Sequence, residues 1–113
     1  MKNKSESFDI NKIQLQIQSP HVTINEELND YIIAQIEKLG KLFNRIERCE
    51  AMLLTRKNSQ KEVCEMEVKI FVPGKTLFAK EHKANFRLAA QFVFDDLYAQ
   101  LQKFKGHLNE SGS

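Results

Sequence analysis

The chain has 113 residues, of which 42% are hydrophobic and 28% charged, the composition of an ordinary soluble globular protein. No hydrophobic run approaches the roughly 18 residues of a membrane span, and the first residues lack a secretory signal. The formal net charge is only +2, so the total charge does not by itself indicate a nucleic-acid partner. We expect a cytoplasmic protein with one domain at residues 11–108, between a flexible tail at residues 1–10 and a disordered tail at residues 109–113.

The first predicted elements are a strand and a helix. Residues 12–18 alternate hydrophobic residues with polar ones, as a strand with one buried face does. Asn25 is a favourable helix N-cap, and Glu26 and Glu27 suit the first turn. Hydrophobic residues then recur at helical spacing, which predicts a helix over residues 26–43. They are Leu28, Ile32, Ile36, Leu39 and Phe43.

Three strands and a second helix follow. The strands are predicted at residues 47–56, 62–72 and 76–82, with a polar turn at 56–61 and a tight turn at Pro73-Gly74. Asn85 is expected to cap the second helix, whose hydrophobic stripe runs from Ala90 to Leu108.

This order of elements predicts an α+β fold. We expect a two-layer βαβββα sandwich, with a four-stranded sheet and both helices packed on one face, similar in shape to double-stranded RNA-binding domains. The other sheet face should be open to solvent. The residues expected on it are Gln14, Gln16, Glu50, Glu65, Glu67 and Lys69.

No sequence pattern indicates a catalytic centre. The chain lacks a serine elbow, a glycine-rich phosphate loop and an HExxH motif, and its three histidines are far apart. Cys49 and Cys64 match no zinc or redox spacing and are expected to be reduced and buried. A metal site formed by these two cysteines and His82 is a minor alternative. We expect no enzymatic activity, no metal and no cofactor.

Basic residues gather in several short segments, in contrast to the small net charge. Those near the first helix, the start of the second helix and its end are candidates for phosphate contacts. They are Lys38, Lys41, Arg45, Lys80, Lys83, Arg87, Lys103 and Lys105. Arg56, Lys57 and Lys61 are candidates of second rank. The alternative for each is an ordinary solvated surface charge.

The segment SPHVTINEELNDYIIAQIEKLGKLFNRI, residues 19–46, resembles the start of the ribosome hibernation-promoting factors, also called ribosome-associated inhibitor A or the sigma-54 modulation family. The residues that fit the family pattern are Val22, Ile24, Leu28, Tyr31, Lys38, Leu39, Lys41, Phe43, Arg45 and Ile46. The last helix is similar through Leu97, Gln100, Leu101, Lys103 and Lys105, so the resemblance covers residues 12–108. The chain departs from the pattern at the start of the last helix, where Asn85, Arg87 and Gln91 replace family residues.

The resemblance implies a ribosome-bound function. Family members bind the small ribosomal subunit, on 16S rRNA and nearby ribosomal proteins, in the channel for messenger and transfer RNA near the decoding centre. They block translation, preserve idle ribosomes, and in some bacteria take part in forming ribosome dimers. The chain resembles the short form of the family, with no membrane and no small-molecule substrate expected. The alternatives are a general module for structured RNA and a protein-interaction domain that modulates transcription.

Overall fold

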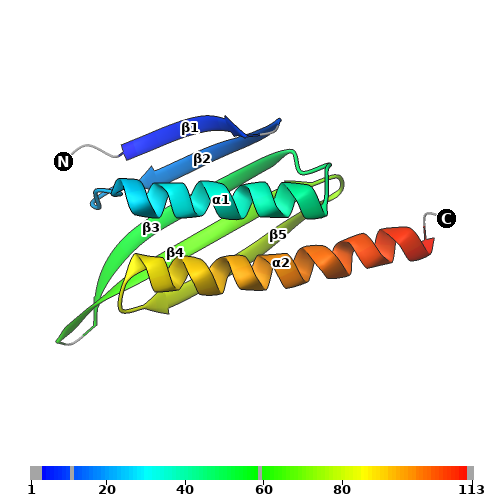
Figure 1. The fold of residues 1–113 in the computed structure, drawn as a ribbon. Coiled ribbons are helices and arrows are strands. Elements are labelled where there is room, and N and C mark those ends of the chain that lie inside the picture. Colours follow the sequence, from blue (N-terminus) through cyan, green and yellow to red (C-terminus); the bar gives the residue numbers. More distant parts are fainter. Residues whose placement is uncertain (1–3, 11, 59, 112–113) are drawn as a thin grey trace.

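The computed structural model describes residues 4–10, 12–58 and 60–111 (Figure 1). In chain order the elements are β1 (Lys4–Ile10), β2 (Ile13–Ser19), α1 (Glu26–Leu42), β3 (Arg48–Asn58), β4 (Lys61–Val72), β5 (Lys75–Lys83) and α2 (Phe86–Ser111). The predicted α+β fold, with both helices on one face of the sheet, is confirmed. The sheet, however, has five strands instead of the predicted four.

The strands lie in the order β1-β2-β3-β4-β5. Strands β2 and β3 are parallel, while every other neighbouring pair is antiparallel. A parallel pair needs a crossover connection, and α1 supplies it. The two helices run in the same direction across one face of the sheet, and none of the described residues forms a helix on the opposite face (Figure 1).

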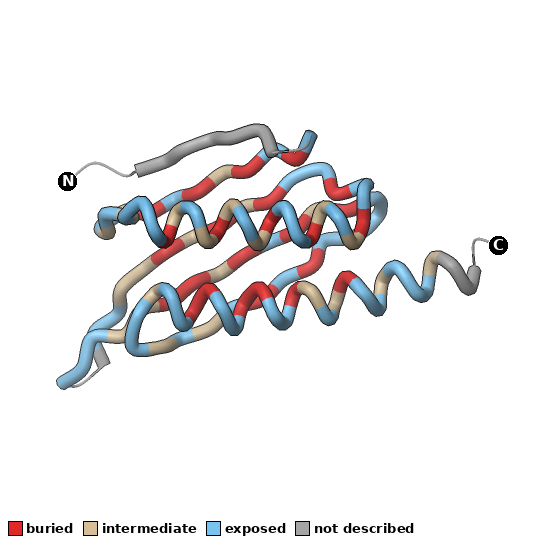
Figure 2. Tube along the Cα trace, in the orientation of Figure 1, coloured by how far each residue is buried: buried red, intermediate tan, exposed pale blue. Residues whose placement is uncertain are grey.

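The hydrophobic core lies between the sheet and the helices. Alternate residues of the strands are buried, and α1 and the first part of α2, up to Leu101, bury one residue or more in each turn (Figure 2). The largest fully buried hydrophobic residues are Leu15, Ile17, Ile32, Ile36, Leu39, Leu53, Met66, Ile70, Phe94, Leu97 and Leu101. The predicted hydrophobic patterns therefore point toward a shared core.

Both predicted helix caps are present. The side-chain oxygen of Asn25 accepts a hydrogen bond from the backbone N–H of Leu28, at 2.8 Å. Asn85 accepts the equivalent bond from Leu88, also at 2.8 Å. The predicted tight turn at Pro73-Gly74 is also confirmed, since Gly74 has a φ of 78°, which glycine adopts without strain.

The prediction of a flexible tail at residues 1–10 is wrong for residues 4–10, which form β1. This strand pairs antiparallel with β2, from Lys4 opposite Ser19 to Ile10 opposite Ile13. Lys12, at a φ of 71°, lies in the reversal between the two strands. Hydrogen bonding to a neighbouring strand orders this polar segment, which has few hydrophobic residues of its own. Residues 1–3 lie outside the described residues.

Two other predicted boundaries change. Helix α2 continues to Ser111, so residues 109–111 of the predicted disordered tail are helical, and residues 112–113 lie outside the described residues. The predicted turn at 56–61 is shorter, because β3 extends to Asn58 and β4 begins at Lys61. The resulting hairpin projects past the helices (Figure 1).

Candidate functional site

Six of the eight candidate RNA-binding residues belong to the helical layer. Lys38 and Lys41 lie on α1, and Arg45 follows its C-terminal end. The other three, Arg87, Lys103 and Lys105, lie on α2. The remaining candidates, Lys80 and Lys83, lie on the edge strand β5.

Cation–aromatic contacts join the two helices. The guanidinium of Arg87 on α2 lies 3.5 Å from the ring centroid of Tyr31 on α1. In a second contact the cation is on α1 and the ring on α2: the ammonium of Lys38 lies 4.7 Å from the ring centroid of Tyr98. Such contacts contribute about 0.5–1 kcal/mol at exposed sites, and they hold the cations over the seam between the helices.

Three of the candidates meet at the C-terminal end of α1. The ammonium of Lys105 donates to the backbone carbonyl of Leu42, at 3.0 Å, and this position also suits a cation because of the helix dipole. Phe43 and Phe104 pack edge to face beside it, with ring centroids 5.5 Å apart. Lys41, Arg45 and Lys105 line one hollow of about 330 Å³ here, and we call these three residues the basic end.

Lys103 lies apart from the basic end. Positions two residues apart on a helix point about 200° away from each other, so Lys103 and Lys105 occupy opposite sides of α2. Lys103 lines a different hollow, between α2 and β5, together with Lys75 and His107. The predicted pair Lys103 and Lys105 is therefore divided between two surfaces.

The six helical-layer candidates differ from the two on β5 in their charge partners. Lys80 lies 3.7 Å from a carboxylate oxygen of Glu65, and Lys83 lies 3.8 Å from one of Glu81. The six others form no ion pair with any side chain that the structure describes. Their positive charge is therefore available to an external anion.

Glu65 on the open sheet face is the centre of an ionic cluster. Its side chain is only 2% exposed, and its carboxylate accepts a hydrogen bond from Nε of Arg56 at 2.6 Å. Nε2 of His82 lies 2.9 Å away. The hydrogen bond from Arg56 is the main cause that lowers the pKa of Glu65. Glu65 does point to the open face as predicted, but its neighbours cover it.

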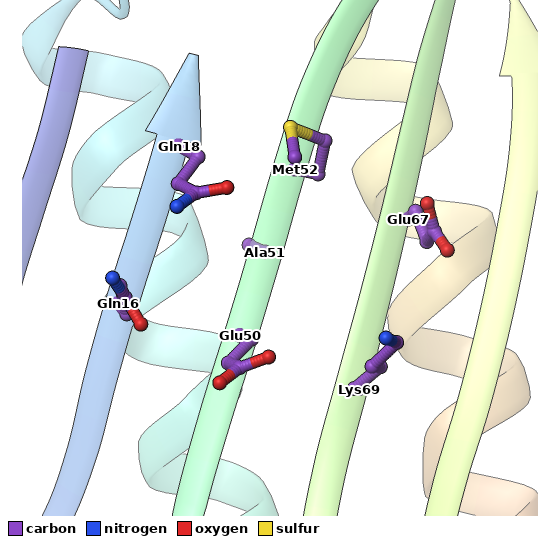
Figure 3. Close-up of a pocket in the computed structure, with 7 residues that line it drawn as sticks. All are labelled: Gln16, Gln18, Glu50, Ala51, Met52, Glu67 and Lys69. Atoms are coloured by element: carbon purple, nitrogen blue, oxygen red, sulfur yellow. The ribbon is translucent and has the colours of Figure 1, made fainter. Parts of the chain in front are cut away.

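A hollow of about 210 Å³ lies on the same open face, across β2, β3 and β4 (Figure 3). Its charged lining consists of the carboxylates of Glu50 and Glu67 and the ammonium of Lys69. Glutamine side chains and Met52 complete the wall. Because the negative groups outnumber the positive one, this hollow is a poor site for phosphate.

The two cysteines are unbridged, as predicted. Cys49 is fully buried, and this burial raises the pKa of its thiol. Cys64 is half-buried, and its sulfur lies 3.7 Å from the backbone oxygen of Ala84. Among the residues that the structure describes, no three His, Cys, Asp or Glu side chains are grouped to hold a metal ion. None of the described helices is long and apolar enough to span a membrane.

Comparison with known proteins agrees with the resemblance in the sequence. The model of the family described as Sigma 54 modulation protein / S30EA ribosomal protein matches residues 15–109. The chain belongs to this family. Strand β1 lies before the matched region.

Curated relatives in this family are hibernation factors. The chain is 28% identical over 92 residues to the ribosome hibernation promotion factor of Deinococcus radiodurans, a match that covers 80% of the chain and 48% of that protein. It is 25% identical over 93 residues to the ribosome hibernation promoting factor of Pseudomonas putida, covering 82% of the chain and 87% of the relative. The chain thus spans about half the length of the first relative and most of the second.

Two solved structures have a similar fold. A ribosomal subunit interface protein from Coxiella burnetii matches with a TM-score of 0.67 at 17% identity, covering 83% of this chain and 97% of that one. The N-terminal domain of Thermus thermophilus Protein Y matches with a TM-score of 0.61 at 18% identity, covering 86% of this chain and 99% of that one.

The sequence did not indicate the aromatic partners of the basic residues. From the sequence, Tyr31 is only a residue that fits the family pattern, and Tyr98 has no predicted role. Each ring contacts a cation from the other helix, so the pairing depends on how the helices pack. No basic residue lies within four positions of either tyrosine along its own helix, so the sequence offers no signal for these contacts.

Proposed function

We propose that this protein is a cytoplasmic ribosome hibernation factor. It binds the small ribosomal subunit in the channel for messenger and transfer RNA, near the decoding centre, and so blocks translation and preserves idle ribosomes. The observation that carries this proposal is the family match over residues 15–109, together with the hibernation factors among the relatives.

The charge distribution supports binding through the helical layer. Affinity for folded RNA comes largely from neutralised phosphates, and RNA helices are recognised mainly through shape, phosphates and 2′-hydroxyls. The six helical-layer cations have no ion-pair partner among the described side chains. The hollow on the open sheet face has an excess of carboxylates. The basic end and the seam between the helices are therefore the surface we assign to ribosomal RNA.

The test is co-sedimentation with purified small ribosomal subunits at moderate salt. Reversing Lys38, Lys41 and Arg45 to glutamate should abolish binding and leave the fold intact, because all three residues are exposed. Retained binding by this triple variant would refute the assignment of the surface.

A matched pair of single reversals controls for total charge. Lys41→Glu and Lys69→Glu change the net charge equally, but Lys41 lies at the basic end and Lys69 on the open sheet face. Only Lys41→Glu should weaken binding. A duplex RNA competitor tests the wider alternative: a general RNA module would bind free duplex as tightly as it binds the subunit.

A further inference from the structure

The guanidinium of Arg87 lies over the ring of Tyr31. Its central carbon lies 3.5 Å from the ring centroid. An edge-on guanidinium at that distance would drive a nitrogen into the ring, so the two planes must lie roughly parallel. Arg87 is exposed and Tyr31 is half-buried, so one face of the guanidinium is against the ring and the other faces outward.

Two neighbours fix this arrangement. The ring of Tyr31 packs against the hydrophobic core, which holds the surface under the guanidinium in place. Nη1 of Arg87 also makes a long hydrogen bond of 3.5 Å to the side-chain oxygen of Gln91, one turn along α2. Arg87 and Gln91 are two of the positions at which the chain departs from the family pattern. The flat cation is thus held in position before any ligand arrives.

We propose that Arg87, supported by Tyr31, is a stacking site for one unpaired nucleobase of the bound RNA. This inference rests on the proposed function. Proteins that recognise RNA loops and bulges stack unpaired bases on aromatic rings and on arginine planes. A guanidinium already held flat loses little side-chain entropy on binding. In the bound state, the ring of Tyr31, the guanidinium of Arg87 and the base would form a stack of three layers.

The surroundings favour a base over a phosphate. Arg87 borders a hollow of about 340 Å³ at the start of both helices, which Glu27 and the hydrophobic residues Leu28 and Phe86 also line. The N-terminal ends of α1 and α2 attract anions, but the carboxylate of Glu27 opposes a phosphate placed between them and does not oppose an uncharged base. The half-buried ring of Phe86 adds apolar surface, and Asn25 and Asn85 add polar groups that a base edge can contact.

A second close arginine–ring contact, outside the helical layer, provides a control. The guanidinium of Arg48 lies 4.2 Å from the ring of Phe71 on the open sheet face, where it also pairs with Glu50 at 3.1 Å. It has a similar chemical arrangement but lies outside the surface we assign to RNA. Arg48→Lys therefore makes the same chemical change as Arg87→Lys at a site where no effect on binding is expected.

The experiment measures equilibrium binding of the full chain to purified small ribosomal subunits over a range of salt concentrations. Arg87→Lys keeps the charge and loses the plane, while Arg87→Tyr keeps a plane and loses the charge. A stacking site predicts that R87K weakens binding about tenfold and that R87Y binds more tightly than R87K. It also predicts that the salt dependence of R87Y equals that of the unchanged protein, because no phosphate contact is lost.

The opposite ranking would overturn the stacking site. A phosphate-binding Arg87 predicts that R87K binds more tightly than R87Y and that R87Y has a weaker salt dependence. Variants that all bind like the unchanged protein would also overturn it, as would an R48K variant that is weakened as much as R87K. If the unchanged protein does not bind small subunits, the proposed function itself fails, and this outcome is distinct from all the others.

Discussion

Glu65 is a carboxylate that the fold hides almost completely, although it lies on the solvent side of the sheet. Arg56 from β3 and His82 from β5 approach its oxygens to 2.6 and 2.9 Å, and the side chain is 2% exposed. A buried carboxylate is stable only when its oxygens are paired, so these contacts stabilise the charged form. Glu65 therefore ties three neighbouring strands together.

Glu65→Gln tests this role in stability. At pH 7 the variant should be less stable by about 1–3 kcal/mol, because it loses charge-assisted hydrogen bonds. The folded protein lowers the pKa of Glu65 below its ordinary value of 4.5, so the stabilisation is complete above that pH. It is lost as the pH falls through the lower, folded-state pKa. Urea unfolding at pH 7 and at pH below about 4 should show a difference that shrinks with acid.

Glu67→Gln is the control for Glu65→Gln. Glu67 lies on the same strand and the same face but forms no ion pair within 4 Å among the described side chains. Its loss should change stability by less than about 0.5 kcal/mol. If Glu65→Gln and Glu67→Gln lowered the free energy of unfolding equally at pH 7, the ionic cluster would contribute no more to stability than an unpaired carboxylate does.

The sequence could predict the direction of Glu65 but not its burial. Strict alternation with Cys64 and Met66 puts it on the outer face, and the structure agrees. Its burial depends on side chains from β3 and β5, which reach it only because the register sets Glu65 between Leu54 and His82. Single-strand periodicity contains no information about that register.

At the scale of elements, β1 changes the environment of β2. Without β1, strand β2 would be an edge strand with a row of unpaired backbone groups, which is an aggregation hazard. The backbone N–H of Gln14 donates toward β3, to the carbonyl of Glu47. Since neighbouring amides of a strand point to opposite sides, the N–H groups of Leu15 and Ile17 point to β1 and that of Gln16 to β3.

Hydrogen exchange tests whether β1 is a strand. Deleting residues 1–10 should speed exchange at the amides of Leu15 and Ile17 by about tenfold or more, because they lose their partners. The amide of Gln16 serves as an internal control, since its partner is on β3. Unchanged protection at Leu15 and Ile17 would contradict the pairing of β1 with β2.

The elements with strong hydrophobic periodicity were predicted correctly, and β1 was not. Both helices combine an asparagine cap with a one-sided hydrophobic stripe, so local pattern and packing agree. The segment KSESFDI of β1 has only two hydrophobic residues and depends on its partner strand for order. Composition alone gives such a segment the appearance of a tail.

For the whole molecule, the fold decides which basic residues act together. The eight candidate residues fall in short basic segments of the sequence. Packing brings Lys105, from the last segment, to Lys41 and Arg45 at the C-terminal end of α1. It also places Lys80 on the open sheet face, beside Glu65. Which cations lie together, and which lie beside a carboxylate, is therefore a property of the tertiary structure, which clustered charges in the sequence could indicate only in part.

The salt dependence of binding to the small subunit tests, one residue at a time, which cations contact RNA phosphates. Each phosphate contact contributes about 0.7–0.9 to the slope of log K against log salt concentration. Lys41→Gln should flatten the slope by about that amount, because Lys41 has no described ion-pair partner and lines the basic end. Lys80→Gln should leave it nearly unchanged, because that ammonium lies on the other face of the sheet, 3.7 Å from a carboxylate oxygen of Glu65. Equal flattening by both changes would mean that RNA contacts both faces, and the helical layer would then lose its distinction as the binding surface.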